Sequence, residues 1–129
     1  DFVMQCFDKM WGGEIFVPKI PSYRVTDVAK AIAPDAAINI IGVRPGEKIH
    51  EEMITKSDSM LCVEFDDYYV IMPATNSPKK LWDYEHFLNK SNPTKGKLMK
   101  FGFSYNSKQN NRFLDVKELK VLIKSLNLK

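Results

Sequence analysis

The sequence predicts a mixed α/β fold for this chain of 129 residues. Apolar residues recur at helical spacing in three segments, which lie near residues 1–10, 25–32 and 115–126. Short apolar runs rich in β-branched and aromatic residues, as is typical of strands, lie at residues 14–18, 37–43, 60–65 and 68–72. Gly, Pro, Asn and Asp separate these segments, so each should form one helix or one strand.

The first elements follow directly from this spacing. Asp1 to Met10 should form an amphipathic helix that stops at Gly12-Gly13, and Glu14 to Pro18 should form a short strand. Val25, Val28, Ala29 and Ile32 share one helical face, and Pro34 ends that helix because its ring prevents continuation.

The middle of the chain predicts a short helix followed by a hairpin. Ile49, Met53 and Ile54 would line one face of the helix, with Glu51 and Glu52 on the other. Lys56 to Ser59 form a polar break. Met60 to Phe65 and Tyr68 to Met72 then predict two strands joined by a turn at Asp66-Asp67.

From Pro73 the sequence is richer in turn residues, with a short helix predicted at Leu81 to Leu88. The aromatic segment Phe101 to Asn106 should anchor the tail. Asp115-Val116-Lys117-Glu118 resembles a capping box, so a last helix should begin there. Its apolar face comprises Leu119, Leu122, Ile123 and Leu126. We expect an α/β segment at residues 1–73 and a loop-rich C-terminal extension at residues 74–129.

A turn is expected directly after the apolar run 37–43, which predicts a buried strand. Pro45 fixes φ near −65° and Gly46 permits positive φ, so the turn should present Arg44 and Glu47 together. An arginine fork matches the oxygens of a phosphate, and a carboxylate can accept hydrogen bonds from hydroxyls. The pair would suit a sugar nucleotide. A solvated turn pair of little energetic consequence is the alternative.

Charge is distributed unevenly. Residues 1–78 hold 7 Lys/Arg and 12 Asp/Glu, a balance of −5, whereas residues 79–129 hold 12 and 4, a balance of +8. A basic half can indicate an acidic partner. These lysines lack the interleaved aromatics that stack on single-stranded bases, so we expect a solvated surface and no binding of nucleic acid.

Other classes of site find little support. Cys6 and Cys62 stand far apart without a Cys-x-x-Cys pattern and should be small hydrophobic residues. Glu64, Asp66 and Asp67 lack the alternating spacing and the glycine of a calcium loop, so no metal site is expected. His50 has no second His, Cys or nucleophile near it in the sequence, which is more typical of a surface or hydrogen-bonded residue than of a substrate contact or a catalyst. No run of ~18 apolar residues and no export signal occur, which predicts a cytoplasmic protein without a membrane span.

Three collinear segments resemble one family. They are Gly12-Gly13-Glu14-Ile15-Phe16-Val17-Pro18-Lys19-Ile20-Pro21-Ser22, Thr26-Asp27-Val28-Ala29-Lys30-Ala31, and Ile41-Gly42-Val43-Arg44-Pro45-Gly46-Glu47-Lys48-Ile49-His50-Glu51. The family is that of the inverting UDP-N-acetylglucosamine 4,6-dehydratases of bacterial surface-sugar synthesis, which are extended short-chain dehydrogenases/reductases. The resemblance is good over residues 1–73 and looser in the tail.

The resemblance implies a fold and a set of site residues. The chain would be the C-terminal substrate-binding part of an extended Rossmann-type enzyme, with Arg44 on the diphosphate and Glu47 on the ribose of a UDP-sugar. Lys19 would help to neutralise phosphate, or would be an ordinary surface lysine. The parent enzyme would be a homo-oligomeric, NADP-dependent lyase.

The same resemblance shows what the chain lacks. Gly12-Gly13 is not followed by a third spaced glycine, so no nucleotide-binding fingerprint is present. The family's Tyr-x-x-x-Lys pair is also missing, because the five tyrosines are followed four positions on by Asp27, Met72, Pro73, Leu88 and Gln109. We therefore expect an inactive fragment without catalytic residues or bound cofactor, which would act with a missing N-terminal Rossmann domain. A related UDP-sugar epimerase and a free-standing interaction module with a basic tail are the alternatives.

Overall fold

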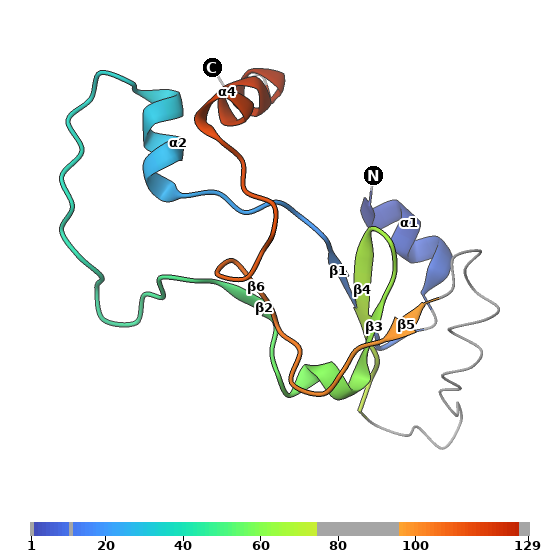
Figure 1. Cartoon of the computed structure of the whole chain (residues 1–129). Coiled ribbons are helices and arrows are strands. Elements are labelled where there is room, and N and C mark those ends of the chain that lie inside the picture. The colour runs from blue at the N-terminus through green and yellow to red at the C-terminus, as the bar shows by residue number, and fades with distance from the viewer. Residues whose placement is uncertain (1, 11, 75–95, 127–129) are drawn as a thin grey trace. The chain divides into compact units, whose positions relative to one another are not determined.

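The computed structural model describes residues 2–10, 12–74 and 96–126. The chain divides into two compact units (Figure 1). Unit 1 comprises Asp1–Lys19 and Glu52–Tyr105, and unit 2 comprises Ile20–Glu51 and Asn106–Lys129. Each unit takes residues from both sides of position 73, so the functional division at residue 73 stays a prediction. The helix predicted at Leu81 to Leu88 lies outside the described residues.

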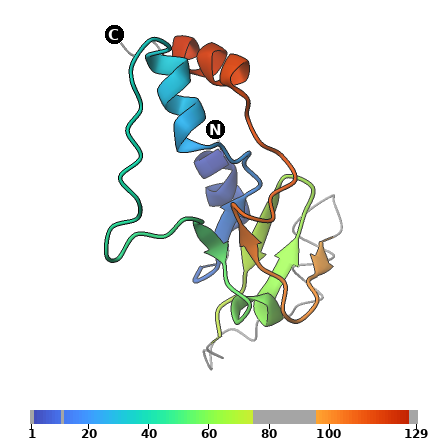
Figure 2. The same cartoon turned by 60° about the vertical axis from the view of Figure 1, so that its left-hand side comes forward.

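Unit 1 is built on a four-stranded sheet in which all neighbours are antiparallel (Figure 2). The strand order is β1-β4-β3-β5, with β1 at Ile15–Pro18, β3 at Cys62–Glu64, β4 at Tyr68–Ile71 and β5 at Lys97–Leu98. The predicted hairpin is confirmed as β3 and β4. At its turn the backbone N–H of Phe65 donates to the carbonyl of Tyr68 at 2.8 Å.

The core of unit 1 has two parts because successive side chains of a strand point to opposite faces. Tyr68 and Val70 of β4 pack into one cluster with Val63, Phe65 and Met72. Tyr69, which lies between them in the sequence, packs into a second cluster with Val17, Ile54 and Cys62. Helix α1, Phe2–Lys9, confirms the predicted first helix, and its Phe2 packs against the first cluster.

The helix predicted around Ile49 to Ile54 is wrong. Glu52–Ile54 is a strand, β2, which forms a two-stranded sheet with β6, Tyr105–Asn106. Ile54 is fully buried whereas Ile49 is 77% exposed, so the apolar stripe that would favour a helix does not form. A short 3-10 helix, η1, spans Asp58–Leu61 within the predicted polar break and the start of the next apolar run.

Unit 2 consists of two helices and long connections. Helix α2 spans Val25–Ile32 and α4 spans Val116–Ser125, as predicted, and they lie side by side (Figures 1 and 2). The capping box of α4 is confirmed. The Asp115 carboxylate accepts from the Glu118 backbone N–H at 2.8 Å, and Glu118 accepts from the Asp115 N–H at 2.9 Å. Leu119 is buried, but Leu122 and Leu126 of the predicted apolar face are 45% and 59% exposed.

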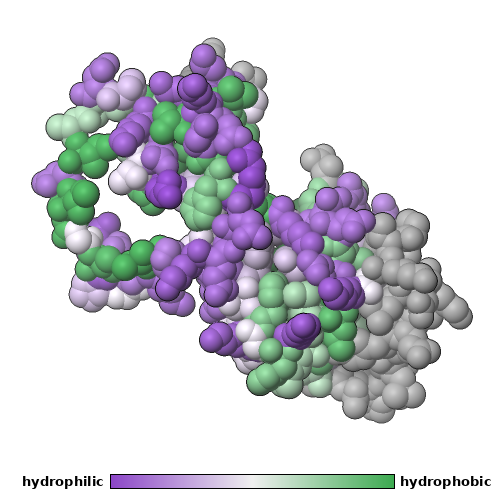
Figure 3. All heavy atoms as spheres, in the orientation of Figure 1, coloured by the Kyte–Doolittle hydropathy of each residue, from purple (hydrophilic) through white to green (hydrophobic). Residues whose placement is uncertain are grey.

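The buried strand predicted at residues 37–43 is also wrong. This segment has no regular secondary structure, and Ile40 and Ile41 are 82% and 75% exposed. Figure 3 shows hydrophobic residues along the loop that carries it, at the left of the view. A strand needs a partner to satisfy its backbone groups, and no strand within the described residues pairs with this segment.

Candidate functional site

The turn predicted at Pro45-Gly46 is present in unit 2. The backbone N–H of Glu47 donates to the carbonyl of Arg44 at 3.0 Å, which closes a four-residue turn. Gly46 has φ of 87°, a left-handed value that side chains other than glycine rarely adopt. Proline followed by such a glycine is typical of a type II turn, so the local backbone follows from these two residues.

The turn brings the side chains of Arg44 and Glu47 together. Nε of Arg44 lies 2.9 Å from Oε1 of Glu47, and the backbone N–H of Arg44 donates to Oε2 of Glu47 at 3.0 Å. The side chains are 73% and 47% exposed. Within the described part of the chain, neither terminal guanidinium nitrogen of Arg44 has a hydrogen-bond partner. The turn therefore holds an arginine whose outer edge is available to an anion.

The chain after the turn is tied to Ser107. The Ser107 hydroxyl accepts from the backbone N–H of Glu51 at 3.1 Å and lies 3.4 Å from Nδ1 of His50, while the Ser107 N–H donates to the Glu51 carbonyl at 2.9 Å. His50 is thus hydrogen-bonded, one of the two roles that its sequence context favoured. Nothing local in the sequence could identify Ser107 as this anchor, because the two segments are more than 50 residues apart.

Lys19 lies in unit 1, whereas Arg44 and Glu47 lie in unit 2. Its ammonium is 2.9 Å from the Glu64 carboxylate and 4.8 Å from the centre of the Tyr69 ring. Burial, and then the charge of Glu64, raise the pKa of Tyr69 to about 12. Lys19 is therefore held by neighbours in its own unit, and its contribution to phosphate binding stays a prediction.

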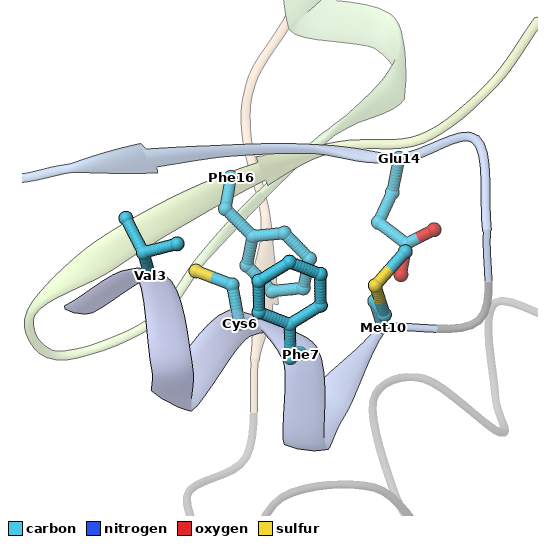
Figure 4. A pocket seen from close by; sticks show the side chains of 6 residues that line it. All are labelled: Val3, Cys6, Phe7, Met10, Glu14 and Phe16. Atoms are coloured by element: carbon cyan, nitrogen blue, oxygen red, sulfur yellow. The ribbon is translucent and has the colours of Figure 1, made fainter. Parts of the chain in front are cut away.

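An open hollow of about 100 Å³ lies between α1 and β1 (Figure 4). It is lined by Val3, Cys6, Phe7, Met10, Glu14 and Phe16. Sites for small molecules commonly enclose ≈ 300–1,000 Å³ and combine apolar walls with several converging polar groups. The hollow is too small and too apolar to hold a sugar nucleotide, so it is not a second candidate for that ligand.

Metal binding, disulfide formation and membrane insertion find little support among the described residues. Among them, no group of three or more His, Cys, Asp or Glu side chains could hold a metal ion. Cys6 and Cys62 are free, and burial raises the pKa of Cys62 to about 11, so its thiol stays protonated at neutral pH. No helix in this part of the chain has the length and apolar character needed to span a bilayer.

Comparison with known proteins gives consistent matches. The family model described as "Polysaccharide biosynthesis protein" matches residues 1–73. The chain is 46% identical over 122 residues to a UDP-N-acetylglucosamine 4,6-dehydratase (inverting) of Campylobacter jejuni, covering 95% of this chain. It is 30% identical over 131 residues to a UDP-glucose 4-epimerase of Rickettsia typhi, covering 98% of this chain.

A solved structure, that of Pen from Bacillus thuringiensis, superimposes with a TM-score of 0.69 at 26% identity and covers 98% of this chain. The chain spans only about a third of each of these proteins: 36% of the dehydratase, 36% of the epimerase and 35% of Pen. The family match covers more than half of the sequence, including the turn at Arg44 to Glu47. The chain therefore belongs to the polysaccharide biosynthesis protein family.

Proposed function

We propose that this chain is the C-terminal, substrate-binding part of an inverting UDP-N-acetylglucosamine 4,6-dehydratase, an extended short-chain dehydrogenase/reductase of bacterial surface-glycan synthesis. The similarity to the Campylobacter jejuni enzyme along almost the whole chain supports this assignment. The observation that carries it is the Arg44 turn, in which an exposed guanidinium keeps both terminal nitrogens available for an anionic ligand.

Arg44 would bind the diphosphate of the UDP-sugar. Two parallel N–H groups of a guanidinium match two phosphate oxygens, and such charge-assisted pairs are stronger than neutral hydrogen bonds. Glu47 would accept hydrogen bonds from the ribose hydroxyls, which is the role that the family resemblance implies. Binding energy from these remote groups orients the reacting sugar carbons, so the turn would support catalysis without touching the reacting atoms.

Within the described residues, the paired glycines do not fit the phosphate cradle of an NADP site. Gly12 and Gly13 precede β1 and do not open a helix, so they cannot form the glycine-rich phosphate cradle of a dinucleotide fold. We assign NADP binding, and the proton transfers of a Tyr-x-x-x-Lys pair, to the part of the enzyme outside this chain. Oxidation at C4, loss of water across C5 and C6, and reduction at C6 with inversion at C5 would take place there, and the isolated chain would be inactive.

The test is the substitution Arg44→Ala in the full-length enzyme. We expect KM for UDP-N-acetylglucosamine to rise more than tenfold, which corresponds to a loss of ~1.4 kcal/mol or more of ligand binding. Arg24→Ala is a matched control, because Arg24 is 71% exposed and also pairs with a carboxylate three residues on, Asp27. An unchanged KM in Arg44→Ala, or equal increases in both variants, would contradict the proposed role.

A UDP-sugar 4-epimerase is the second candidate, because the Rickettsia typhi relative matches nearly the whole chain at lower identity. The two reactions could use the same contacts to the nucleotide but yield different products. Mass spectrometry of the product separates them, since the dehydratase product has lost one water and the epimerase product has the mass of the substrate.

A further inference from the structure

Both carboxylate oxygens of Glu47 contact one residue, Arg44. Oε2 accepts the backbone N–H of Arg44 at 3.0 Å, and Oε1 lies 2.9 Å from Nε of the same arginine. The Glu47 backbone N–H in turn donates to the Arg44 carbonyl at 3.0 Å. The two backbone hydrogen bonds hold the turn and the Glu47 carboxylate in place, and the ion pair at Nε then holds the side chain of Arg44 against that carboxylate.

The side of the guanidinium that Glu47 contacts decides which nitrogens of Arg44 stay available to a ligand. A carboxylate can meet a guanidinium at its terminal edge, through Nη1 and Nη2, or from the side, through Nε. Glu47 uses Nε, and in the described part of the chain it leaves both terminal nitrogens without partners. The bond that holds the arginine therefore does not compete with the edge that would bind two phosphate oxygens.

We infer that Glu47 is a positioning residue for Arg44, which it holds so that the terminal guanidinium edge receives the diphosphate of a nucleotide ligand. This inference rests on the proposed function and deepens it, since the resemblance implies ribose hydroxyls as the partners of Glu47. A free arginine side chain samples many rotamers, and holding it in one before binding reduces the entropy lost on binding. The sequence of the turn supports this role, because Pro45 and Gly46 set the spacing that lets Glu47 reach back.

The two roles of Glu47 differ in how its effect depends on Arg44. A positioning residue acts through the arginine, so its removal does not change ligand affinity once the arginine has been replaced. A ribose contact acts directly on the ligand and keeps its effect in either background. A double-mutant cycle separates the two, because it measures the coupling between two residues.

The experiment uses the full-length protein and measures the Kd of UDP by calorimetry for the wild type, Arg44→Ala, Glu47→Ala and the double variant. Exposed ion pairs contribute little, so we expect Glu47→Ala to weaken UDP binding only about fivefold in the wild-type background. In the Arg44→Ala background it should change Kd by less than about 1.5-fold. Glu47→Gln keeps one acceptor and should recover part of the loss. Asp27→Ala, which breaks the comparable pair with Arg24, should leave Kd unchanged.

Each outcome bears on one proposal. If Glu47→Ala lowers affinity by the same factor in both backgrounds, Glu47 contacts the ligand directly and the positioning role is wrong, while the diphosphate role of Arg44 stands. If Glu47→Ala has no effect in either background, the positioning role is also wrong. If Arg44→Ala leaves UDP binding unchanged, the proposed function of the turn is wrong, and the positioning role of Glu47 is wrong with it. Thermal unfolding of each variant separates loss of binding from loss of fold.

Discussion

The two units of the chain differ in where their apolar residues lie. Within the described residues, every buried hydrophobic side chain except Leu119 belongs to unit 1. Unit 2 carries the Arg44 turn on a long loop whose isoleucines are largely exposed. Unit 1 therefore contains most of the packing that stabilises the fold, and unit 2 contains the group that we propose binds the ligand. This separation means that most core substitutions should alter stability and most turn substitutions should alter binding.

The strongest test of this difference is a pair of isoleucine truncations. Ile54 is fully buried in the second cluster of unit 1, whereas Ile40 is 82% exposed in unit 2. Ile54→Ala should lower the free energy of unfolding by roughly 3 kcal/mol, because it removes buried methyl groups and leaves a cavity. Ile40→Ala should change it by less than about 0.5 kcal/mol. Equal changes in the free energy of unfolding, measured in urea, would contradict the proposed difference in packing between the two units.

A glycine in unit 1 tests how closely that core is packed. A Cβ added at Gly96 would lie 2.7 Å from Cγ1 of Val63 and 2.8 Å from the ring of Phe65, and both of these residues are buried. Gly96→Ala should therefore lower the free energy of unfolding by about 2 kcal/mol through overpacking. Gly42→Ala separates overpacking from backbone strain, because a Cβ there meets no atom within 4 Å but the φ of 85° would cost an alanine roughly 1 kcal/mol. Differential scanning calorimetry of the two variants should show the larger fall in Tm for Gly96→Ala.

The capping box of α4 tests the stability of unit 2. Asp115→Ala removes the acceptor of the Glu118 N–H and should lower the free energy of unfolding by roughly 1 kcal/mol. Asp115→Asn keeps an acceptor and should recover most of the loss. Hydrogen exchange of the first-turn amides of α4 should accelerate in Asp115→Ala. If these amides exchange as slowly as in the wild type, the capping interaction contributes no stability.

The smallest expected effect is a pH dependence that comes from Asp58 in unit 1. A hydrogen bond from the Thr55 hydroxyl at 2.5 Å, and then one from the Thr55 N–H at 2.9 Å, lower the pKa of Asp58. A lowered pKa stabilises the fold above the unfolded-state pKa of ~4, and this contribution disappears as the pH falls through the folded-state pKa. It should be less than ~1 kcal/mol near the surface. Asp58→Asn should be less stable at pH 7, and its difference from the wild type should shrink below pH 4.

The sequence predicted the elements whose determinants are local. Helix α2 follows from the spacing of Val25, Val28 and Ile32 and from Pro34, and the start of α4 follows from Asp115 and Glu118. The turn at Pro45-Gly46 follows from the φ preferences of those two residues. In each case the residues that decide the structure lie within a few positions of one another, so a single stretch of sequence contains the necessary information.

The two wrong predictions involve contacts between distant segments. The run at residues 37–43 has strand-like composition, but nothing in that composition shows whether a partner strand lies beside it. Glu52 to Ile54 form a strand because they pair with β6, and β6 lies more than 50 residues later in the chain. The same limit applies to the site. Arg44 and Glu47 could be identified from the turn itself, whereas Ser107 lies too far along the chain to be identified from it.

One backbone contact of unit 2 has a consequence for the order of assembly during synthesis. Ser22 forms a parallel bridge with Phe113, supported by hydrogen bonds of 2.9 Å from the Ser22 N–H to the Arg112 carbonyl and 2.8 Å from the Leu114 N–H to the Ser22 carbonyl. Closing a loop of roughly 90 residues carries an entropic cost that local contacts do not, so we expect this contact to form late. On the ribosome, α2 emerges long before the segment that completes its unit. Unit 2, which includes the loop with Arg44, can therefore be completed only after the segment around Phe113 has been synthesised.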